Sequence, residues 1–207
     1  MPKLSKAQIS IGVLIILHLV GIIGLSSSFQ DYFLALTPIN LIVSGYFVLR
    51  HGKKSQAILF TLIAVITYLV ELMGIHTGFP FGDYFYGNSL GPHLYNVPIL
   101  IGLLWLLLLL GASHFSSKVT KQPILHSLLV ATLMTLLDFA IEPVAIQLDF
   151  WTWLSTEIPW NNYAAWFGTA LLLSFISKTN NEFGNNKVAA VFFIIQTVFF
   201  LSLNFIL

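Results

Sequence analysis

The sequence predicts an all-α fold, a polytopic membrane bundle of about seven transmembrane helices with the N-terminus inside and the C-terminus outside. Hydrophobic residues make up 57% of the 207 residues and charged residues only 8%, whereas a soluble domain carries about 25% charged residues. Apolar stretches of helix length recur along the chain, and all nine basic residues fall before the first of them or between alternate pairs of them. We expect a single transmembrane helical domain over residues 1–207, in the inner membrane of a bacterial or archaeal cell.

The individual helices follow from length, because a bilayer core needs about 20 mostly apolar residues per helix and fewer where the membrane thins. In chain order the candidate spans are 7–25, 32–49, 57–75, 97–115, 124–148, 163–177 and 188–206. The first follows Lys3 and Lys6 as the apolar part of a signal peptide would. Its apolar run is long and GLSSSFQDY is a poor cleavage site, so we expect a retained membrane anchor. The sixth span is the shortest.

The charges predict the orientation of these helices. With the N-terminus inside, the inner segments are 1–6, 50–56, 116–123 and 178–187, and they hold all nine Lys and Arg residues. The outer loops hold no basic residue, and their acidic residues are Asp31, Asp83, Asp149 and Glu157. This is the pattern of the positive-inside rule. Removing one helix would move lysines to the outer side, so the partition supports a count of seven.

Two polar, turn-rich segments then fall on the outer side of the membrane. ELMGIHTGFPFGDYFYGNSLGP (71–92) covers the outer end of the third span and the loop after it. LLDFAIEPVAIQLDFWTWLSTEIPWNNYAAW (136–166) covers the outer end of the fifth span and continues beyond it. Glycine and proline in the first segment permit tight turns and close backbone approach. We expect the two segments to build one polar region.

Three carboxyl groups inside the predicted spans are candidate catalytic residues. Glu71 and Asp138 each lie 14 residues beyond the inner start of their span, at Ala57 and Ile124. Both therefore sit about 21 Å up a core roughly 30 Å thick, and Glu142 follows one turn above Asp138 on the same face. Ionisable groups at such depth are costly and by default mark a functional site. A hydrogen-bonded network that only packs helices is the alternative, and for three carboxyls we favour function.

The surroundings suggest what these acids do. The spans contain no basic residue to pair with them, so burial favours the neutral, protonated acid. Pro143 directly after Glu142 is expected to kink the helix and aim that carboxyl. A neutral acid in an apolar, aromatic cavity is suited to protonate an unactivated double bond, because π faces and a nearby carboxylate stabilise the carbocation. The rings available are Phe79, Phe81, Tyr84, Phe85, Tyr86, Trp151, Trp153, Trp160 and Trp166.

Some of these residues have a simpler explanation. For Trp151, Trp153 and Trp160, an aromatic belt at the membrane interface is as good an interpretation as a role in a site. Asn161 and Asn162 either hold water or cap the sixth helix.

The first polar segment also resembles a family signature. ELMGIHTGFPFGDYFYGNSLGPHLYNVPILIGLLW is similar to the pattern E-x-x-G-x-x-x-G-x-P-F-G-x-Y-x-Y, then L-G and V-P with a Trp shortly after, of the membrane carotenoid-biosynthesis protein family. The matching positions are Glu71, Gly74, Gly78, Pro80, Phe81, Gly82, Tyr84, Tyr86, Leu90, Gly91, Val97, Pro98 and Trp105. DFAIEPVA, FWTW and IPWNNYAAWF also resemble the family, with Glu142 where many members carry Asp. The family includes hydratases of the carotenoid 1′,2′-hydratase and bisanhydrobacterioruberin hydratase type, and it is distantly similar to small-subunit lycopene cyclases.

The resemblance implies hydration of a carotenoid that reaches the enzyme from the lipid phase. The substrate would have an open, lycopene-like end with a terminal trisubstituted alkene. Of Glu71, Asp138 and Glu142, one would protonate the alkene, water would capture the tertiary cation, and another would act as stabiliser or base. His76 and Asp83 are candidates for placing or deprotonating the water. The residues expected to bind the substrate are Phe79, Phe81, Tyr84, Tyr86, Trp151, Trp153, Asn161, Asn162 and Trp166.

Other classes of function remain as alternatives. A lycopene-type cyclase would use the same protonation, with an internal double bond in place of water. A retinal protein needs a lysine in the middle of its last helix, and here only Lys187 stands at the inner mouth of that span. A non-enzymatic carotenoid carrier would not need three buried carboxyls. We expect no cofactor and no metal, since the chain has no cysteine, no G-x-G-x-x-G motif and no His pair at metal-binding spacing. We also expect no nucleic-acid partner.

Overall fold

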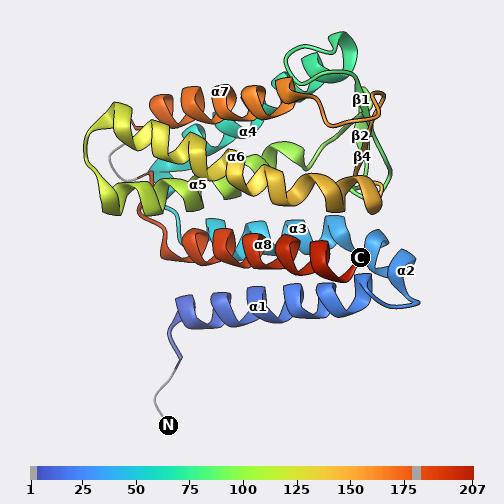
Figure 1. The fold of residues 1–207 in the computed structure, drawn as a ribbon. Coiled ribbons are helices and arrows are strands. Elements are labelled where there is room, and N and C mark those ends of the chain that lie inside the picture. The colour runs from blue at the N-terminus through green and yellow to red at the C-terminus, as the bar shows by residue number, and fades with distance from the viewer. Residues whose placement is uncertain (1–3, 179–182) are drawn as a thin grey trace.

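A computed structural model describes residues 4–178 and 183–207 as a bundle of helices that run side by side (Figure 1). The long helices are α1 (Lys6–Leu25), α4 (Ala57–Thr77, extended by the 3-10 turn Lys54–Gln56), α5 (Ile101–Val119), α6 (Pro123–Gln147), α7 (Trp160–Ser177) and α8 (Lys187–Ile206). Two shorter helices are α2 (Gln30–Ala35) and α3 (Thr37–Leu49). Four short strands complete the described part: β1 (Tyr84–Tyr86), β2 (His93–Leu94), β3 (Val97–Pro98) and β4 (Trp151–Trp153).

Five of these helices are long and apolar enough to cross a membrane, namely α1, α4 with its 3-10 extension, α5, α6 and α8. They correspond to the first, third, fourth, fifth and seventh predicted spans. The sixth predicted span appears as α7, which begins at Trp160. The protein is thus an integral membrane protein of the all-α class, and the count of seven spans stays a prediction.

The prediction of one continuous helix over 32–49 is wrong. The chain forms α2 and α3 instead, with a break at Leu36. Pro38 occupies the first turn of α3, where its missing N–H costs nothing. In a continuous helix the same residue would leave the Leu34 carbonyl without its donor and clash with that turn.

The fourth helix also begins later than predicted, at Ile101 instead of residue 97. Val97 and Pro98 form β3, which pairs antiparallel with β2. This small hairpin turns the chain back from the outer loop into α5.

Helix α5 lies at the centre of the bundle and packs against α3, α4, α6, α7 and α8. Its apolar run Leu106–Leu110 is completely buried. Two glycines permit this close packing. A Cβ on Gly102 would collide with the Ala64 carbonyl of α4, and a Cβ on Gly111 would lie 2.6 Å from the Ala189 carbonyl of α8.

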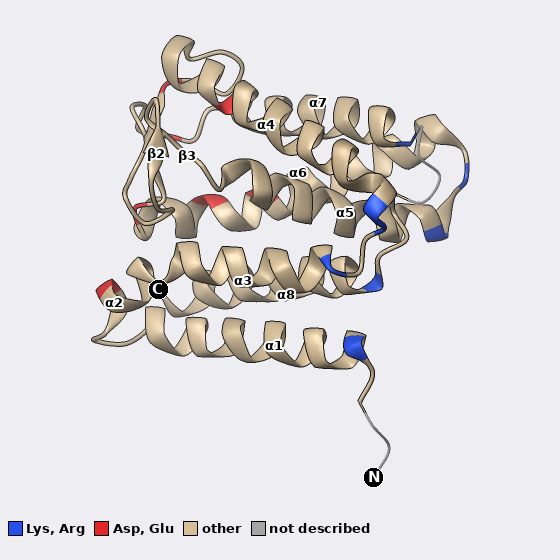
Figure 2. Cartoon of the chain, turned by 180° about the vertical axis from the view of Figure 1, so that it is seen from behind, with Lys and Arg blue, Asp and Glu red and all other residues tan. Residues whose placement is uncertain are grey.

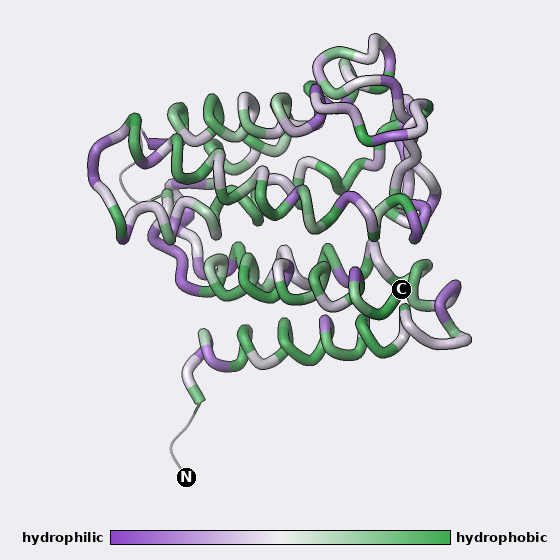
Figure 3. Tube along the Cα trace, in the orientation of Figure 1, coloured by the Kyte–Doolittle hydropathy of each residue, from purple (hydrophilic) through white to green (hydrophobic). Residues whose placement is uncertain are grey.

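Charge and hydropathy are both polarised along the bundle. Within the described residues, Lys and Arg gather at one end of the helices, while acidic residues lie toward the other end or inside it (Figure 2). The helices are mostly hydrophobic, and hydrophilic residues concentrate in the connections at both ends (Figure 3). The two polar segments of the sequence lie together at the acidic end.

Candidate active site

A two-stranded ribbon brings the two polar segments together. Strands β1 and β4 pair antiparallel, with Tyr84 opposite Trp153 and Tyr86 opposite Trp151. Side chains two apart in a strand share a face, so these four large side chains project to the same side. Figure 1 shows the ribbon across the end of α4, α6 and α7. The ribbon thereby aims two phenols and two indoles at the buried carboxyl groups below it.

Glu71 of α4 is held by three donors. The hydroxyls of Tyr84 and Tyr86 donate to its Oε2 at 2.6 Å and 2.7 Å. The indole Nε1 of Trp105 in α5 donates to its Oε1 at 3.0 Å. Burial raises the pKa of Tyr84 and Tyr86 well above the usual value, and the nearby Glu71 carboxyl adds to it. Both phenols therefore remain protonated donors throughout the physiological pH range.

Glu142 of α6 is likewise an acceptor on both oxygens. Trp151 and Trp153 of the ribbon donate their indole N–H groups to Oε2 at 3.1 Å and 2.9 Å. Asn162 of α7 donates its amide to Oε1 at 2.7 Å. An indole can only donate and an ionised carboxylate can only accept. The contacts of Glu142 therefore match a group that accepts at both oxygens.

Asp138 differs from the other two acids in having one free oxygen. Asn162 Nδ2 donates to Asp138 Oδ2 at 2.9 Å, so a single amide group bridges Asp138 and Glu142. Asp138 is fully buried, and its Oδ1 has no hydrogen-bond partner among the described residues. An unpaired carboxylate oxygen in such a place is costly. A proton on Oδ1 neutralises this unpaired oxygen without breaking a hydrogen bond, so this atom is the natural place for a proton.

The acids border a small cavity of about 20 Å³. Glu71 and Glu142 line it, and its remaining walls are mainly aromatic and aliphatic side chains from β1, β4, α5, α6 and α7. A cavity of roughly 10–15 Å³ that offers polar partners is enough for one water molecule. The site as folded thus offers room for one water between carboxyl groups and aromatic rings. Asp138 lies behind this cavity, connected to it through Asn162.

Aromatic packing holds the cavity walls in place. The rings of Trp105 and Trp166 stack with their centroids 4.1 Å apart. Tyr84 packs edge-on against Phe81 and lies tilted against Trp153 at 5.1 Å. Some of these rings come from the helices and others from the ribbon, and their mutual packing preforms the cavity.

The structure gathers most of the residues expected from the sequence, and leaves some apart. Glu71, Phe81, Tyr84, Tyr86, Glu142, Trp151, Trp153, Asn162 and Trp166 line the small cavity. His76, Phe79, Asp83 and Asn161, together with Phe85 and Trp160, are exposed and outside it. His76 lies in the last turn of α4 and Asp83 precedes the ribbon, so neither belongs to the carboxyl cluster, and their roles stay predictions.

Trp105 is the residue that reasoning from the sequence does not place in the site. In the sequence it stands out only as the end of the first signature, inside an otherwise leucine-rich span. It is 1% exposed and is the third donor to Glu71. A buried indole N–H usually requires an acceptor, and that rule could have linked it to one of the acids.

Comparisons with known proteins indicate the family of the chain. A family model described as "Carotenoid biosynthesis protein" matches residues 31–206. The chain is also similar to the bisanhydrobacterioruberin hydratase of Haloarcula japonica, with 29% identity over 168 residues that cover 72% of this chain. The match spans about half of that relative, 54% of its length. No solved structure matches the chain.

Proposed function

Because the chain belongs to the carotenoid biosynthesis protein family, we propose that it is a carotenoid hydratase. In this reaction, water adds to the terminal double bond of an acyclic, lycopene-like end group, without a cofactor. The observation that carries the proposal is the water-sized cavity between Glu71 and Glu142 under an aromatic roof. The name of the Haloarcula japonica relative supports the same reaction class.

The carboxyl groups divide the chemistry between them. Asp138 and Glu142, joined by Asn162, act together as the acid. The proton rests on Asp138, whose Oδ1 is unpaired among the described residues, and reaches the cavity through Glu142, which lines it. That proton passes to the less substituted carbon of the alkene and leaves a tertiary cation. The rings and the ionised carboxylates stabilise this cation as it develops. General acid catalysis of this kind is commonly worth about 10²–10⁴-fold in rate.

Glu71 completes the reaction on the other side of the cavity. Water attacks the cation and forms a protonated alcohol, and the Glu71 carboxylate takes the surplus proton. The hydroxyls of Tyr84 and Tyr86 hold that carboxylate and border the same cavity. Water then returns the proton to the Asp138–Glu142 pair, so the net reaction is the addition of one water molecule. Protonating the weakly basic alkene is the difficult step, and the buried acid pair serves it.

Pigment chemistry in a lycopene-producing host tests the reaction. We expect expression of the chain to yield a carotenoid heavier by one water, and ¹⁸O from labelled water should appear in the new alcohol. The conversion should proceed without O₂ and in the presence of chelator. An unchanged mass with altered absorption would establish the cyclase alternative. Label from ¹⁸O₂, or activity lost in chelator and restored by iron, would contradict hydration by acid and water.

The orientation proposed is N-terminus inside and C-terminus outside, in the bacterial or archaeal inner membrane. The gathering of Lys and Arg at one end of the helices supports it (Figure 2). Reporter fusions after Lys54 and Lys121 should read cytoplasmic, and fusions after Asn88 and Glu157 should read external. A cytoplasmic signal at Asn88 would exclude this arrangement and place the carboxyl cluster on the opposite side.

A further inference from the structure

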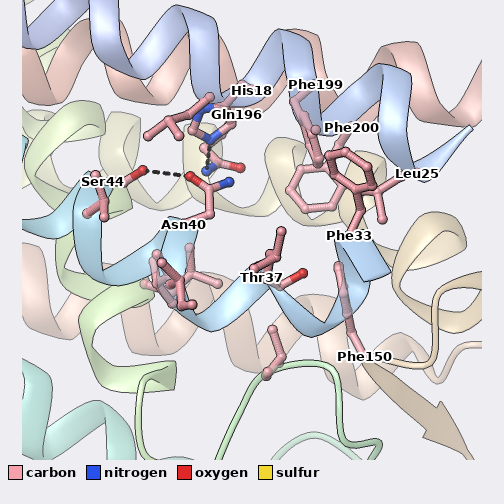
Figure 4. A pocket seen from close by; sticks show the side chains of 18 of the residues that line it. His18, Leu25, Phe33, Thr37, Asn40, Ser44, Phe150, Gln196, Phe199 and Phe200 are labelled. Atoms are coloured by element: carbon pink, nitrogen blue, oxygen red, sulfur yellow. Dashed lines mark hydrogen bonds between the residues drawn. The ribbon is translucent and has the colours of Figure 1, made fainter. Parts of the chain in front are cut away.

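A second and larger cavity, of about 230 Å³, lies between α1, α3 and α8. Figure 4 shows its two kinds of wall. His18, Asn40, Ser44 and Gln196 gather at one end, and Leu25 with the rings of Phe33, Phe199 and Phe200 gathers at the other. Val20 of α1 and Ile39 of α3 line this cavity and are themselves 48% and 56% exposed. The cavity therefore has a mouth on the outer face of the bundle, between two apolar helices.

The large cavity and the candidate active site share a wall. Leu104, Ile141 and Trp151 line both the large and the small cavity. Trp151 also donates its indole N–H to Glu142 at 3.1 Å. One side chain therefore contacts the space of the large cavity and the acid pair at once.

The two cavities differ so much in volume that they suit different molecules. The small cavity of about 20 Å³ fits one water molecule, and the large one of about 230 Å³ holds a far bulkier group. The end of a carotenoid cannot enter the small cavity as it is folded, so it must approach the acids from the side of the shared wall. If the side chain of Leu104 or Ile141 rotated, the shared wall would open and an alkene in the large cavity could contact the acid site.

The lining of the large cavity fits a neutral, conjugated chain. Among the described residues that line it there is no Asp, Glu, Lys or Arg. At the polar end, His18 Nδ1 donates to the Leu14 carbonyl at 2.8 Å, which leaves Nε2 to accept from the Gln196 amide at 3.1 Å. Ser44 donates to Asn40 at 3.3 Å. These polar groups bond to one another and require no charged ligand, while the phenylalanine rings offer faces and edges to a π system.

We propose that this cavity binds the polyene part of the substrate, which enters from the lipid between α1 and α3. Its end group then lies against Leu104, Ile141 and Trp151, next to the acid pair. That the bound molecule is a polyene rests on the proposed function. That it binds in this cavity rests on the geometry of the two cavities. A long polyene would leave its far portion in the lipid, since the cavity holds only part of it.

Matched tryptophan substitutions at the mouth test the proposal. Ile39 lines the cavity and is 56% exposed, whereas Ile42, about one turn along α3, is 53% exposed and does not line it. Val20, which lines the cavity, and Ile16, which does not, form a second pair on α1. All four positions face outward, so a bulkier side chain there should not prevent folding. Only Ile39→Trp and Val20→Trp place the indole in the mouth.

The measurement is retention of lycopene by protein purified in lipid nanodiscs, read from the pigment absorption per protein, together with the KM and kcat for conversion. We expect Ile39→Trp and Val20→Trp to weaken retention and to raise KM roughly tenfold, about 1.4 kcal/mol, with little change in kcat. Ile42→Trp and Ile16→Trp should match the unmodified protein.

The outcomes separate the cavity from the reaction. If all four variants behave like the unmodified protein while conversion proceeds, the binding site is elsewhere and the hydratase assignment stands. If the unmodified protein retains no lycopene, the cavity proposal fails. If lycopene is retained and only the two mouth variants lose it, but no hydrated product forms, the cavity stands and the proposed reaction is wrong.

Discussion

Asp138→Asn is expected to abolish most of the hydratase activity, by about 10²–10⁴-fold, because the amide cannot supply the proton of the acid pair. The substitution suits the local geometry. The carbonyl oxygen of the introduced amide can accept from Asn162 as Asp138 Oδ2 does now, at 2.9 Å. The amide nitrogen would take the place of Oδ1, which has no partner among the described residues. The protein should therefore insert and fold as before.

Membrane content and thermal unfolding in detergent provide the control for this variant. Unchanged amounts and an unchanged unfolding temperature, combined with lost conversion, would separate chemistry from packing. Normal conversion by Asp138→Asn would show that Asp138 only joins α6 to α7. The acid would then have to be Glu142 or Glu71, the two carboxyls that line the small cavity.

The sequence predicts the positions of the three carboxyl groups, because simple helix geometry decides them. Helix rise alone places Glu71 and Asp138 at one depth, and helix periodicity places Glu142 one turn above Asp138. Because the depth and the face of a residue follow from the geometry of a regular helix, the clustering of the three carboxyl groups is predicted without knowledge of any tertiary contact. The matching polarity of segments 71–92 and 136–166 then indicates that they meet.

What the sequence does not predict depends on contacts between distant segments. Strands β1 and β4 have three residues each, which is too short for a periodic pattern to be recognised. Their pairing nevertheless determines that Tyr84 and Tyr86 face Glu71, while Trp151 and Trp153 face Glu142. Nearness in sequence groups His76 and Asp83 with the acids, but His76 in the last turn of α4 and Asp83 in the loop after it are both exposed.

The division of the second span shows a different limit. Its composition is mostly apolar, so hydropathy alone predicts one helix. The local stereochemistry of Pro38 decides otherwise. The resulting bend between α2 and α3 has a consequence for function, because residues Phe33 and Thr37 on either side of it line the large cavity.

Glu142→Gln and Glu71→Gln are expected to differ sharply in stability, although both replace a carboxyl by an amide. The amide has one accepting oxygen and one donating nitrogen. At Glu142, Oε2 faces two indole N–H groups and Oε1 faces the amide of Asn162. Either orientation of a glutamine amide at this position sets its N–H groups against a donor. Only a flip of Asn162 relieves this, and the flip removes its hydrogen bond to Asp138.

At Glu71 the partners can adapt. With its oxygen toward Trp105, a glutamine side chain at this position would point its amide nitrogen at the hydroxyls of Tyr84 and Tyr86, which rotate and accept. We therefore expect Glu142→Gln to lose about 1–3 kcal/mol of stability, the usual cost of an unpaired buried polar group, and Glu71→Gln to lose little. Both variants should lose conversion, since each removes a carboxylate from the small cavity. Thermal unfolding in one detergent, measured beside pigment conversion, tests the contrast. Equal unfolding temperatures for the two variants would contradict the acceptor-only assignment of Glu142, and a fully active Glu71→Gln would remove Glu71 as the base.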